Sequence, residues 1–426
     1  MPMTSPQNPE ATNTMTRARD ARPGMLDSLG RKALFAKLQD LRNGCLVLME
    51  GSERHRFGKP SAELPDPLII HVHDAQLYGD VAFGGSVGAG EAYMRGYWST
   101  SQLVDVVRLF VLNMETLEGL EGGLARFTSP VRKAIHTLRR NTRDGSRRNI
   151  AAHYDLGNEF FRLFLDETLM YSAATFEHTG QSLYDAQLAR LDTICRKLEL
   201  KPGDHLLEIG TGWGGLALHA ARHFGCRVTT TTISREQWQL ARERVREAGL
   251  EDRIEVLCED YRDLNGTYDK LVSIEMIEAI GHQYYDTYFE RCARLLKPEG
   301  AMLLQSITIA DQRYERARRS VDFIQRYIFP GSCIPSVAAL TASIARAGDL
   351  RLFHLQDIGP HYATTLAHWR HNFRANLPKI RALGYDETFI RMWEYYFCYC
   401  EGGFAERVLG DVQMLLVKPG NRCATL

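Results

Sequence analysis

The stretch "LLEIGTGWGGLALHAARHFG", residues 206–225, decides the fold. An apolar run, a glycine-rich turn and an amphipathic run follow one another in it, which predicts the first strand, turn and helix of a nucleotide-binding sheet. The glycines are spaced G-x-G-x-G, whereas a dinucleotide fingerprint needs G-x-G-x-x-G. Glu208 stands two residues before Gly210, and a carboxylate beside the turn favours a cationic ligand over a pyrophosphate.

After residue 151, strand-like segments alternate with amphipathic ones such as Arg235–Glu247. This alternation predicts an α/β domain with a doubly wound, mostly parallel, Rossmann-like sheet. We expect residues 411–419 to close the sheet as an antiparallel edge strand. Ligands of such sheets bind at the carboxyl ends of the strands, so the loops after the first four strands should surround one pocket. The predicted strands are residues 205–209, 227–233, 254–260, 268–274 and 301–307.

Length and composition narrow the class of protein. A chain of 426 residues predicts about two domains and a tail. The 52 basic and 52 acidic residues give a formal net charge of +0, which argues against nucleic-acid binding by charge. The 9 cysteines include no C-x-x-C pair, which indicates a reducing compartment and no metal site. Without an apolar run of spanning length or a leader, we expect a cytoplasmic protein.

The part before residue 151 divides into three segments. The interpretation rests on short strands at 67–74 ("PLIIHVHD") and 78–85 ("YGDVAFGG") and a helix at 101–114 ("SQLVDVVRLFVLNM"), which together indicate a small α+β domain. The predicted organisation is a disordered tail at 1–25, a small N-terminal domain at 26–129, a basic linker at 130–150 and a catalytic domain at 151–426.

The linker region is strongly basic. Seven arginines and Lys133 lie between residues 126 and 148, against the single acid Asp144. One interpretation is a solvated linker. The other is a face that meets anionic lipid headgroups, where each cation adds about 1 kcal/mol.

Polar side chains follow the second, third and fourth predicted strands of the catalytic domain. Thr232 ends the second, Asp260 and Tyr261 end the third, and Glu275 and Glu278 follow the fourth. Polar, largely acidic strand ends together with the G-x-G-x-G turn describe a site for S-adenosylmethionine, a sulfonium cation that carries an amino acid and a nucleoside. Glu208 belongs to the same predicted cofactor site.

Several blocks of the chain resemble the cyclopropane-fatty-acyl-phospholipid synthase family, which is related to the mycolic acid cyclopropane synthases. The resemblance covers roughly residues 149–418, and "GEAYMRGYW" (90–98) is more loosely similar to the lipid-side domain of the phospholipid-acting members. The blocks that carry it include "AAHYDLGNEFFRLFLDETLMYSAATF" (151–176), "SIEMIEAIGHQYYDTYF" (273–289), "RRSVDFIQRYIFPG" (318–331) and "HYATTLAHW" (361–369).

The resemblance implies a position for the cofactor. It implies that Tyr171 and Ser172 close over the sulfonium and its carboxylate, and that the backbone of the glycine turn approaches the cofactor. For Ser172, Thr232 and Gln237 the alternative of a helix cap or a surface polar group stays open. The implied set is Tyr171 and Ser172 at the sulfonium and its carboxylate, Gly210 and Gly212 at the turn, Thr232 and Gln237 at the ribose, and Asp260 and Tyr261 near adenine.

The resemblance also implies a reaction. The expected activity is transfer of a methyl group from S-adenosylmethionine to the double bond of an unsaturated phospholipid acyl chain, with closure to a cyclopropane. The alternative is a methyl- or methylene-branched chain without ring closure. An alkene is a weak nucleophile, so a dry, orienting pocket is needed. Aromatic faces can stabilise the cation that forms, and the candidates are Tyr171, Tyr362, Phe397 and Tyr399.

Ring closure needs a proton acceptor. Members of the family hold a bicarbonate ion through a Cys, a Glu, a His and a Tyr; Glu278 and Tyr362 match, whereas Ala173 and Gln305 replace the Cys and the His. These departures leave a bicarbonate site in doubt. Glu401 is aligned at helical spacing with Phe397 and Phe404, so it is either a second base or a buried partner of Arg407. The predicted catalytic set is Glu278, Tyr362, Glu401 and Gln305.

The expected partners are an unsaturated phospholipid acyl chain and an anionic membrane surface, with the protein peripheral at the inner face of the membrane. Nucleic acid is not expected. The oligomeric state is left open, a homo-oligomer included.

Overall fold

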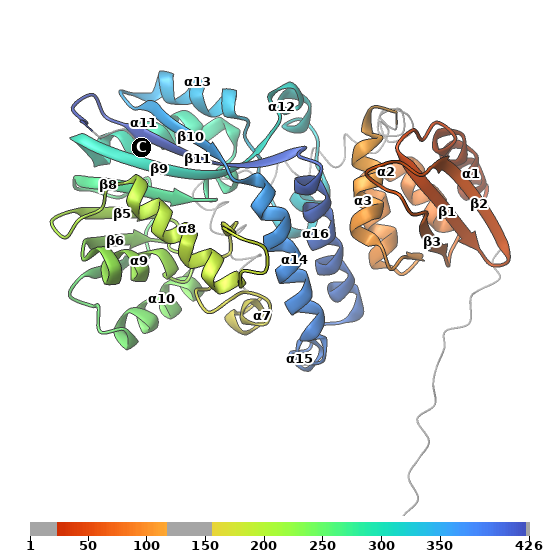
Figure 1. Ribbon diagram of the computed structural model, residues 1–426, viewed down its shortest axis with the longest axis horizontal. Coiled ribbons are helices and arrows are strands. Elements are labelled where there is room, and N and C mark those ends of the chain that lie inside the picture. The colour runs from red at the N-terminus through yellow and green to blue at the C-terminus, as the bar shows by residue number, and fades with distance from the viewer. Residues whose placement is uncertain (1–23, 117–155, 423–426) are drawn as a thin grey trace, which may run out of the picture.

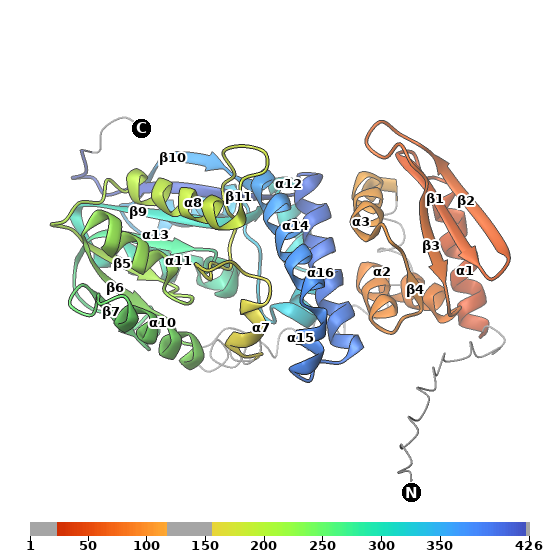
Figure 2. The same cartoon turned by 60° about the horizontal axis from the view of Figure 1, so that its bottom comes forward.

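The computed structural model describes residues 24–116 and 156–422, which form two α/β units (Figure 1). The smaller unit contains a four-stranded sheet and the larger one a seven-stranded sheet. Helices α14 (Gly359–Ala375) and α16 (Glu387–Ala405) stand between the large sheet and the smaller unit in both ribbon views (Figure 2). The predicted basic linker, and all but the last two residues of the predicted tail, lie outside the described residues.

The smaller unit packs three helices on one sheet. The strands have the order β2-β1-β3-β4, with β1 antiparallel to β2 and parallel to β3. The sequence pattern correctly located β3 and α3. The elements are α1 (Met25–Leu38), β1 (Gly44–Glu50), β2 (Glu53–Lys59), β3 (Leu68–Val72), α2 (Gln76–Met94), β4 (Trp98–Ser99) and α3 (Leu103–Leu112).

The strand expected at residues 78–85 is wrong, because this segment belongs to helix α2. Glycine disfavours helices, which made the segment look like a strand bounded by a turn. In the folded protein the missing side chains allow close packing: a Cβ on Gly90 would lie 2.5 Å from the ring of Phe323. Gly85 has φ 58° and ψ −140° and interrupts the helical geometry. Tertiary packing therefore outweighs local propensity here.

The larger unit has the strand order β10-β11-β9-β8-β5-β6-β7. Strands β5 to β9 are all parallel, so the predicted doubly wound, mostly parallel sheet is confirmed. The strands are β5 (His205–Ile209), β6 (Arg227–Thr231), β7 (Ile254–Leu257), β8 (Tyr268–Ile274), β9 (Leu296–Ile309), β10 (Arg351–Asp357) and β11 (Leu409–Val417).

The C-terminal strand β11 is antiparallel, as expected, but it is not an edge strand. It lies between β9 and β10 and pairs with both. The edge is β10, most of whose residues are exposed. Its sequence "RLFHLQD" lacks the apolar run by which the buried strands were recognised.

Helices cover the large sheet, and α14 and α16 lie between it and the smaller unit (Figure 1). Helix α10 begins after Ser234, whose hydroxyl accepts a hydrogen bond from the backbone N–H of Gln237 at 3.3 Å. The remaining helices are α7 (Asn158–Arg162), α8 (Leu183–Lys197), α9 (Gly215–His219), α10 (Arg235–Glu247), α11 (Tyr285–Leu295), α12 (Asp311–Ala317), α13 (Val337–Ala347) and α15 (Leu377–Ala382).

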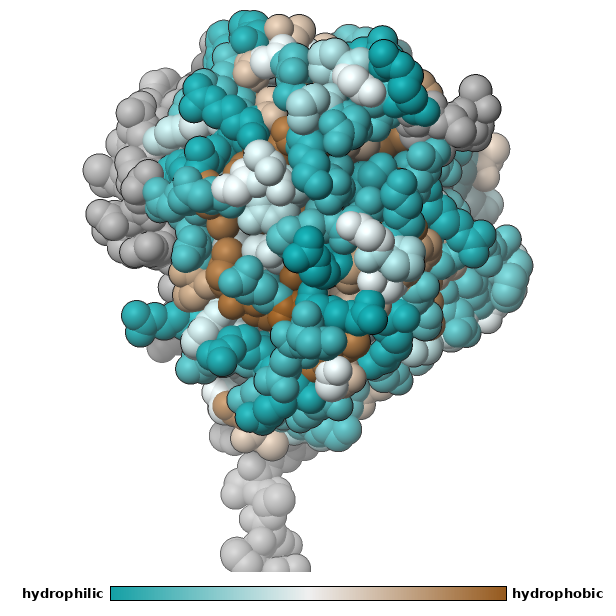
Figure 3. Space-filling view, turned by 90° about the vertical axis from the view of Figure 1, so that its left-hand side faces the viewer, coloured by the Kyte–Doolittle hydropathy of each residue, from teal (hydrophilic) through white to brown (hydrophobic). Residues whose placement is uncertain are grey.

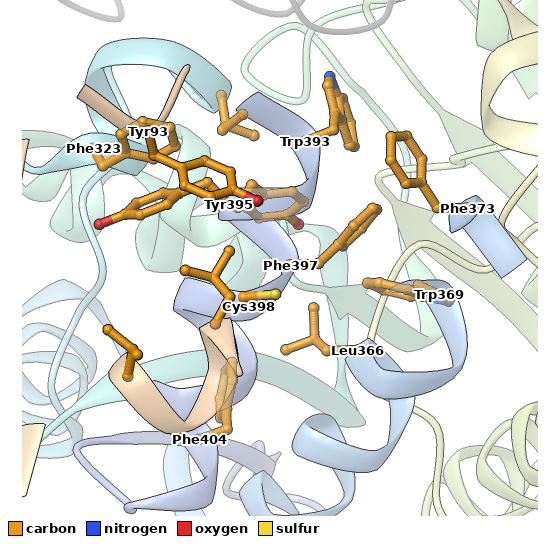
Figure 4. Packing of buried hydrophobic residues seen from close by; sticks show 14 of the residues in the cluster. Tyr93, Phe323, Leu366, Trp369, Phe373, Trp393, Tyr395, Phe397, Cys398 and Phe404 are labelled. Atoms are coloured by element: carbon orange, nitrogen blue, oxygen red, sulfur yellow. The ribbon is translucent and has the colours of Figure 1, made fainter. Parts of the chain in front are cut away.

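An aromatic core joins the two units. Tyr395 of α16 packs against Tyr93 of α2 and against Phe323, with ring centroids 5.6 and 4.7 Å apart (Figure 4). The hydroxyl of Tyr93 donates to the carboxylate of Glu394 at 2.9 Å. The same buried cluster continues through Trp369 of α14. Helix α16 packs against both units. Residues of both units can therefore line a cavity beside this helix.

Candidate active site

A large cavity of 1080 Å³ lies at the carboxyl ends of the strands of the large sheet. The loops after β5, β6, β7 and β8 supply one side of it, as the alternating pattern predicts. Apolar side chains from α14, α16 and the smaller unit supply the other. Hydrophilic residues dominate the opposite end of the large unit, with apolar residues showing only between them (Figure 3).

The glycine turn presents bare backbone to this cavity. Gly210, Gly212 and Gly214 have φ values of +104°, +53° and +85°, a conformation that side chains disfavour. A Cβ on Gly212 would meet nothing within 4 Å, and Gly212 lines the cavity. The turn therefore leaves room for a ligand to approach the chain.

Glu208 lies at the end of β5 and lines the cavity. Its carboxylate accepts a hydrogen bond from the Thr230 hydroxyl at 2.6 Å, and 3% of the residue is exposed. Burial raises the pKa of Glu208 to about 8, although the bond from Thr230 opposes this. A cation beside it would favour its ionised form, as the sequence analysis anticipated for a cationic ligand.

Thr232 and Gln237 face the cavity together. The Thr232 hydroxyl donates to the Gln237 side-chain oxygen at 2.8 Å and accepts from the backbone N–H of Ser234 at 3.1 Å. Ser234, and not Thr232, caps helix α10. Both side chains are buried, which excludes the alternative of surface polar groups.

Asp260 and Tyr261 follow β7 and line the same side. The Arg262 guanidinium donates two hydrogen bonds to the Asp260 carboxylate, from Nε at 2.8 Å and from Nη2 at 2.6 Å. The Arg262 guanidinium also lies over the Tyr261 ring, 5.6 Å from its centroid. These contacts hold a carboxylate and an aromatic ring at the cavity edge, where the nucleoside was expected.

Tyr171 and Ser172 lie on the loop before α8 and line the cavity. The Tyr171 hydroxyl is 2.9 Å from that of Tyr396. Ser172 is 2% exposed, and its hydroxyl has no hydrogen-bond partner among the described residues. A buried hydroxyl without a partner is costly, and a bound ligand with polar groups would satisfy it. This observation and the open space at Gly212 fit S-adenosylmethionine.

The carboxylate of Glu275, directly after β8, is the centre of a second cluster. It accepts hydrogen bonds from the Tyr362 hydroxyl at 2.6 Å, the Gln305 amide at 2.8 Å and the backbone N–H of Ala173 at 2.9 Å. Burial raises the pKa of Glu275, and these donors and Arg190 oppose the shift. Glu275 and Tyr362 line the cavity.

Glu278 lies on the same cavity wall with a different set of contacts. One carboxylate oxygen accepts from the Ser306 hydroxyl at 2.9 Å and from the backbone N–H of Ile307 at 2.6 Å. The other oxygen is buried without a partner among the described residues. Burial, and then repulsion from Glu275, raises the pKa of Glu278 to about 8.

Gln305 is fully buried in β9 and lies behind the cavity wall. Its amide N–H₂ group donates to Glu275 and, at 2.9 Å, to Asp411. Its oxygen accepts from the Arg190 guanidinium at 3.3 Å. Gln305 is therefore placed to orient Glu275 and not to touch a substrate.

Glu401, predicted as either a second base or a buried ion-pair partner, does not line the cavity. Both of its oxygens are bound by Arg370 of α14, at 2.8 and 3.0 Å. Its partner is thus an arginine, though not the Arg407 that we considered. Phe404, aligned with Glu401 at helical spacing, does line the cavity and stacks on Tyr362 with centroids 4.4 Å apart.

Aromatic rings surround the cavity near Glu275. Of the predicted cation-stabilising candidates, Tyr171, Tyr362 and Tyr399 line it, whereas Phe397 is buried in the core behind it. Helical spacing places Phe397 on the inner side of α16, but it cannot say whether core or cavity lies there.

A group of possible metal ligands occurs in the smaller unit, where none was expected. Ligand atoms of Glu50, Glu53 and His55 lie within 4.8 Å of one another. The Arg31 guanidinium lies 3.1 Å from Glu50 and 3.2 Å from Glu53. Because the Arg31 guanidinium already pairs with both carboxylates, we assign no metal site to this group.

Sequence reasoning placed Glu275 among the acidic strand ends near the cofactor but gave it no part in proton transfer, and it overlooked Arg190 and Asp411. Arg190 is fully buried on α8, and the Asp411 carboxyl is fully buried on β11. A signal existed for each: an arginine within an amphipathic helix, and an acid at the start of the apolar run "DVQMLLV". Neither signal says that both side chains contact Gln305 of β9.

Comparisons with known proteins agree with this geometry. The family model for mycolic acid cyclopropane synthetase matches residues 141–414. The tuberculostearic acid methyltransferase UfaA1 of Mycobacterium tuberculosis is 38% identical over 371 residues, which cover 83% of this chain and 83% of that protein. The cyclopropane-fatty-acyl-phospholipid synthase of Escherichia coli K12 is 38% identical over 351 residues, which cover 82% of this chain and 86% of that protein.

A solved structure shows the same arrangement of the catalytic unit. The mycolic acid cyclopropane synthase CmaA1 complexed with SAH and CTAB has a TM-score of 0.60 and 32% identity, and the match covers 64% of this chain and 98% of that one. The resemblance seen in the sequence is thereby confirmed, and S-adenosylmethionine is the cofactor. The chain belongs to the mycolic acid cyclopropane synthetase family of S-adenosylmethionine-dependent methyltransferases.

Proposed function

We propose that the protein adds a methylene group from S-adenosylmethionine across the double bond of an unsaturated phospholipid acyl chain, which forms a cyclopropane ring. The proposal rests on the difference between the two sides of the cavity. Its strand side is lined by the predicted cofactor residues, and its helix side is apolar and extends into the smaller unit through residues such as Leu46, Ile70 and Val107. A methyl donor and a hydrocarbon chain can therefore meet in one enclosed space.

Residues of this chain would hold both reactants. S-adenosylmethionine supplies an electrophilic methyl group when it is bound. Glu208 lies where it can pair with the cationic end of the cofactor, and Ser172 offers an unsatisfied hydroxyl. The rings of Tyr171 and Tyr362 lie at the same wall, where their faces can stabilise a cation on the acyl chain. The apolar helix side excludes water, which would otherwise capture that cation.

The cavity also offers a place for a phospholipid headgroup. Residues 313 and 315–319 line it and contain four arginines and one glutamate, Glu315, so this segment is net cationic. Among residues 24–116 and 156–422, no helix has the length and apolar character needed to cross a bilayer. We infer peripheral binding to an anionic membrane surface, to which the basic stretch 126–148, outside the described residues, would add.

The membrane proposal can be tested by vesicle binding. Binding to anionic vesicles should fall steeply with salt, because exposed charges are screened within a Debye length of about 8 Å at physiological ionic strength. Substitution of Arg139, Arg140, Arg147 and Arg148 by Gln should weaken it further. If binding responds neither to salt nor to these substitutions, the basic stretch is a linker that does not contact lipid.

The second candidate product is a branched chain. The tuberculostearic acid methyltransferase UfaA1 is as similar to this chain as the Escherichia coli cyclopropane synthase is, at 38% identity. The methyl transfer is the same for both products. They differ in whether the cation is captured by ring closure or moves along the chain before a proton is lost.

Lipid analysis decides between these products. The purified chain would be incubated with S-adenosylmethionine and vesicles of a mono-unsaturated phospholipid, with a saturated phospholipid as the control. We expect a mass gain of one CH₂ group only on the unsaturated lipid. Cyclopropane protons in the NMR spectrum identify the ring, whereas olefinic protons of a methylene group identify the branch. No mass gain would overturn the proposed function.

A further inference from the structure

We propose that the carboxylate of Glu275 is the proton acceptor of the reaction, a base built into the chain in place of a bound bicarbonate ion. The proposal rests on the function proposed above and names the residue that completes it.

Three neutral donors from distant parts of the chain converge on this carboxylate. They are the Ala173 backbone N–H from the loop before α8, the Gln305 amide from β9 and the Tyr362 hydroxyl from α14, at 2.9, 2.8 and 2.6 Å. These are positions that the family resemblance associates with a bicarbonate site. Here each of them donates to Glu275, so the carboxylate already occupies the place of an external anion.

The backbone holds Glu275 in an unusual conformation that directs it to this point. Its φ of +48° lies in the left-handed region, which residues other than glycine seldom adopt. Its backbone N–H donates to the Gln305 carbonyl at 2.8 Å. Strained residues of this kind persist where the surrounding structure determines them, and they occur often at active sites.

Glu275 is the better base of the two carboxyl groups on the cavity wall. Neighbouring carboxylates do not both ionise in a buried site, so the one with more stabilisation carries the charge. Glu275 has three donors and the nearby Arg190, whereas Glu278 has two donors and an oxygen without a described partner. Burial also raises the pKa of Asp411, behind Glu275, well above its ordinary value. The pattern predicts ionised Glu275 beside neutral Glu278 and Asp411.

The other acids are less suited to the role. Asp260 forms a salt bridge with Arg262, and Glu208, on the cofactor side, accepts a hydrogen bond from Thr230. Glu401 forms a salt bridge with Arg370 and does not line the cavity. Of the carboxylates that line the cavity, Glu275 is the one bound to Tyr362, whose ring faces the acyl side.

In the proposed reaction, Glu275 accepts the one proton that ring closure releases. The alkene π electrons form a bond to the methyl carbon while its bond to sulfur breaks with the electron pair on sulfur, which leaves a cation on the other alkene carbon. A Glu275 oxygen then takes a proton from the transferred methyl group. The electron pair of that C–H bond forms the second ring bond to the cationic carbon. The carboxylic acid of Glu275 afterwards releases its proton to solvent.

The first test is Glu275→Gln in the full chain, assayed with mono-unsaturated phospholipid vesicles in buffer stripped of carbon dioxide. We expect the wild type to form product without added bicarbonate. The amide preserves the shape of the side chain but cannot accept the proton, so ring formation should fall roughly 10²–10⁴-fold. Affinity for S-adenosylmethionine, measured by calorimetry, should remain. The exposed Glu290→Gln is the matched control and should keep full activity.

The second test is Glu275→Gly with chemical rescue. Glycine adopts a positive φ without strain, so this variant should fold even if the glutamine variant does not. It leaves the donors of Ala173, Gln305 and Tyr362 around an empty space that a small anion can fill. Added bicarbonate or formate should restore product formation, whereas chloride should not.

The outcomes separate this inference from the function on which it rests. If the wild type adds no CH₂ group to any unsaturated lipid, both proposals fail. If the wild type is active but Glu275→Gln is equally active with the same product, Glu275 is not the base. If the wild type is inactive in buffer stripped of carbon dioxide and active only with added bicarbonate, Glu275 is likewise not the base.

Discussion

The two walls of the cavity differ in the way that they hold charge. The strand wall presents Glu208, Glu275 and Glu278, which accept hydrogen bonds from neutral donors. The carboxylate of Glu401, on the helix that forms the other wall, is bound by the Arg370 guanidinium and turned away from the cavity.

The difference teaches how to distinguish a reactive acid from a structural one. A carboxylate held by neutral donors in a buried site keeps a lone pair available and a pKa close to the range needed for proton transfer. A carboxylate held bidentately by arginine has both oxygens engaged and acts as a link between helices. Spacing along one helix cannot separate these cases, because the arginine comes from another helix.

The largest expected effect is at the glycine turn of the strand wall. Gly212→Val should abolish binding of S-adenosylmethionine, because the branched side chain would enter the open space that Gly212 leaves and would need a disfavoured positive φ. Calorimetry measures the affinity, and circular dichroism checks the fold. Unchanged affinity would show that the cofactor does not approach this turn.

Tyr362→Phe should have the next largest effect. It removes the 2.6 Å hydrogen bond to Glu275 but keeps the ring that stacks on Phe404. Hydrogen bonds to charged groups contribute about 1.5–3 kcal/mol, so activity should fall roughly 10- to 100-fold.

The pH profile of Tyr362→Phe gives a sharper test. The lost donor stabilised ionised Glu275, so the pKa of Glu275 should rise. Activity, which requires the ionised form, should therefore be lost at a higher pH than in the wild type as the pH falls. A lower rate with an unmoved profile would indicate that Tyr362 acts only on the substrate.

Glu401→Gln tests the helix wall. It removes the charge that pairs with Arg370, and because the pair is partly exposed we expect a loss of about 1 kcal/mol in the free energy of unfolding. Product formation and the ring-to-branch ratio should not change. Denaturant unfolding and lipid analysis measure the two quantities. Diversion to by-products in this variant would restore Glu401 as a base.

The smallest expected effect is the release of less than one proton by Glu208 when S-adenosylmethionine binds. The folded protein holds the Glu208 proton up to about pH 8, whereas the ordinary pKa is 4.5. The contribution of Glu208 therefore makes the free energy of unfolding of the ligand-free protein fall as the pH rises between these values.

A bound cation should reverse this preference and release the Glu208 proton near pH 7. The binding enthalpy of S-adenosylmethionine should then vary with the ionisation enthalpy of the buffer, and Glu208→Gln should reduce that variation. Equal buffer dependence in the variant would place the proton release elsewhere.

The sequence alone determined the α/β class, the βα unit at 206–225 and most strands of the large sheet, and it predicted a set of cofactor residues that all line the cavity. These features are local, because each depends on the period of apolar residues or on a glycine spacing within one segment. The helix α2 shows where such reasoning fails, since its glycines are explained only by a partner such as Phe323, far along the chain.

The tertiary structure alone decided which acids act together. Glu275, Gln305 and Tyr362 are separated in the chain by other strands and helices, and only the folding of β8, β9 and α14 brings them within hydrogen-bond distance. The same holds for Arg370 and Glu401, which meet because α14 packs on α16. A carboxyl group acquires its pKa and its role from neighbours in space, and a linear pattern contains no record of those neighbours.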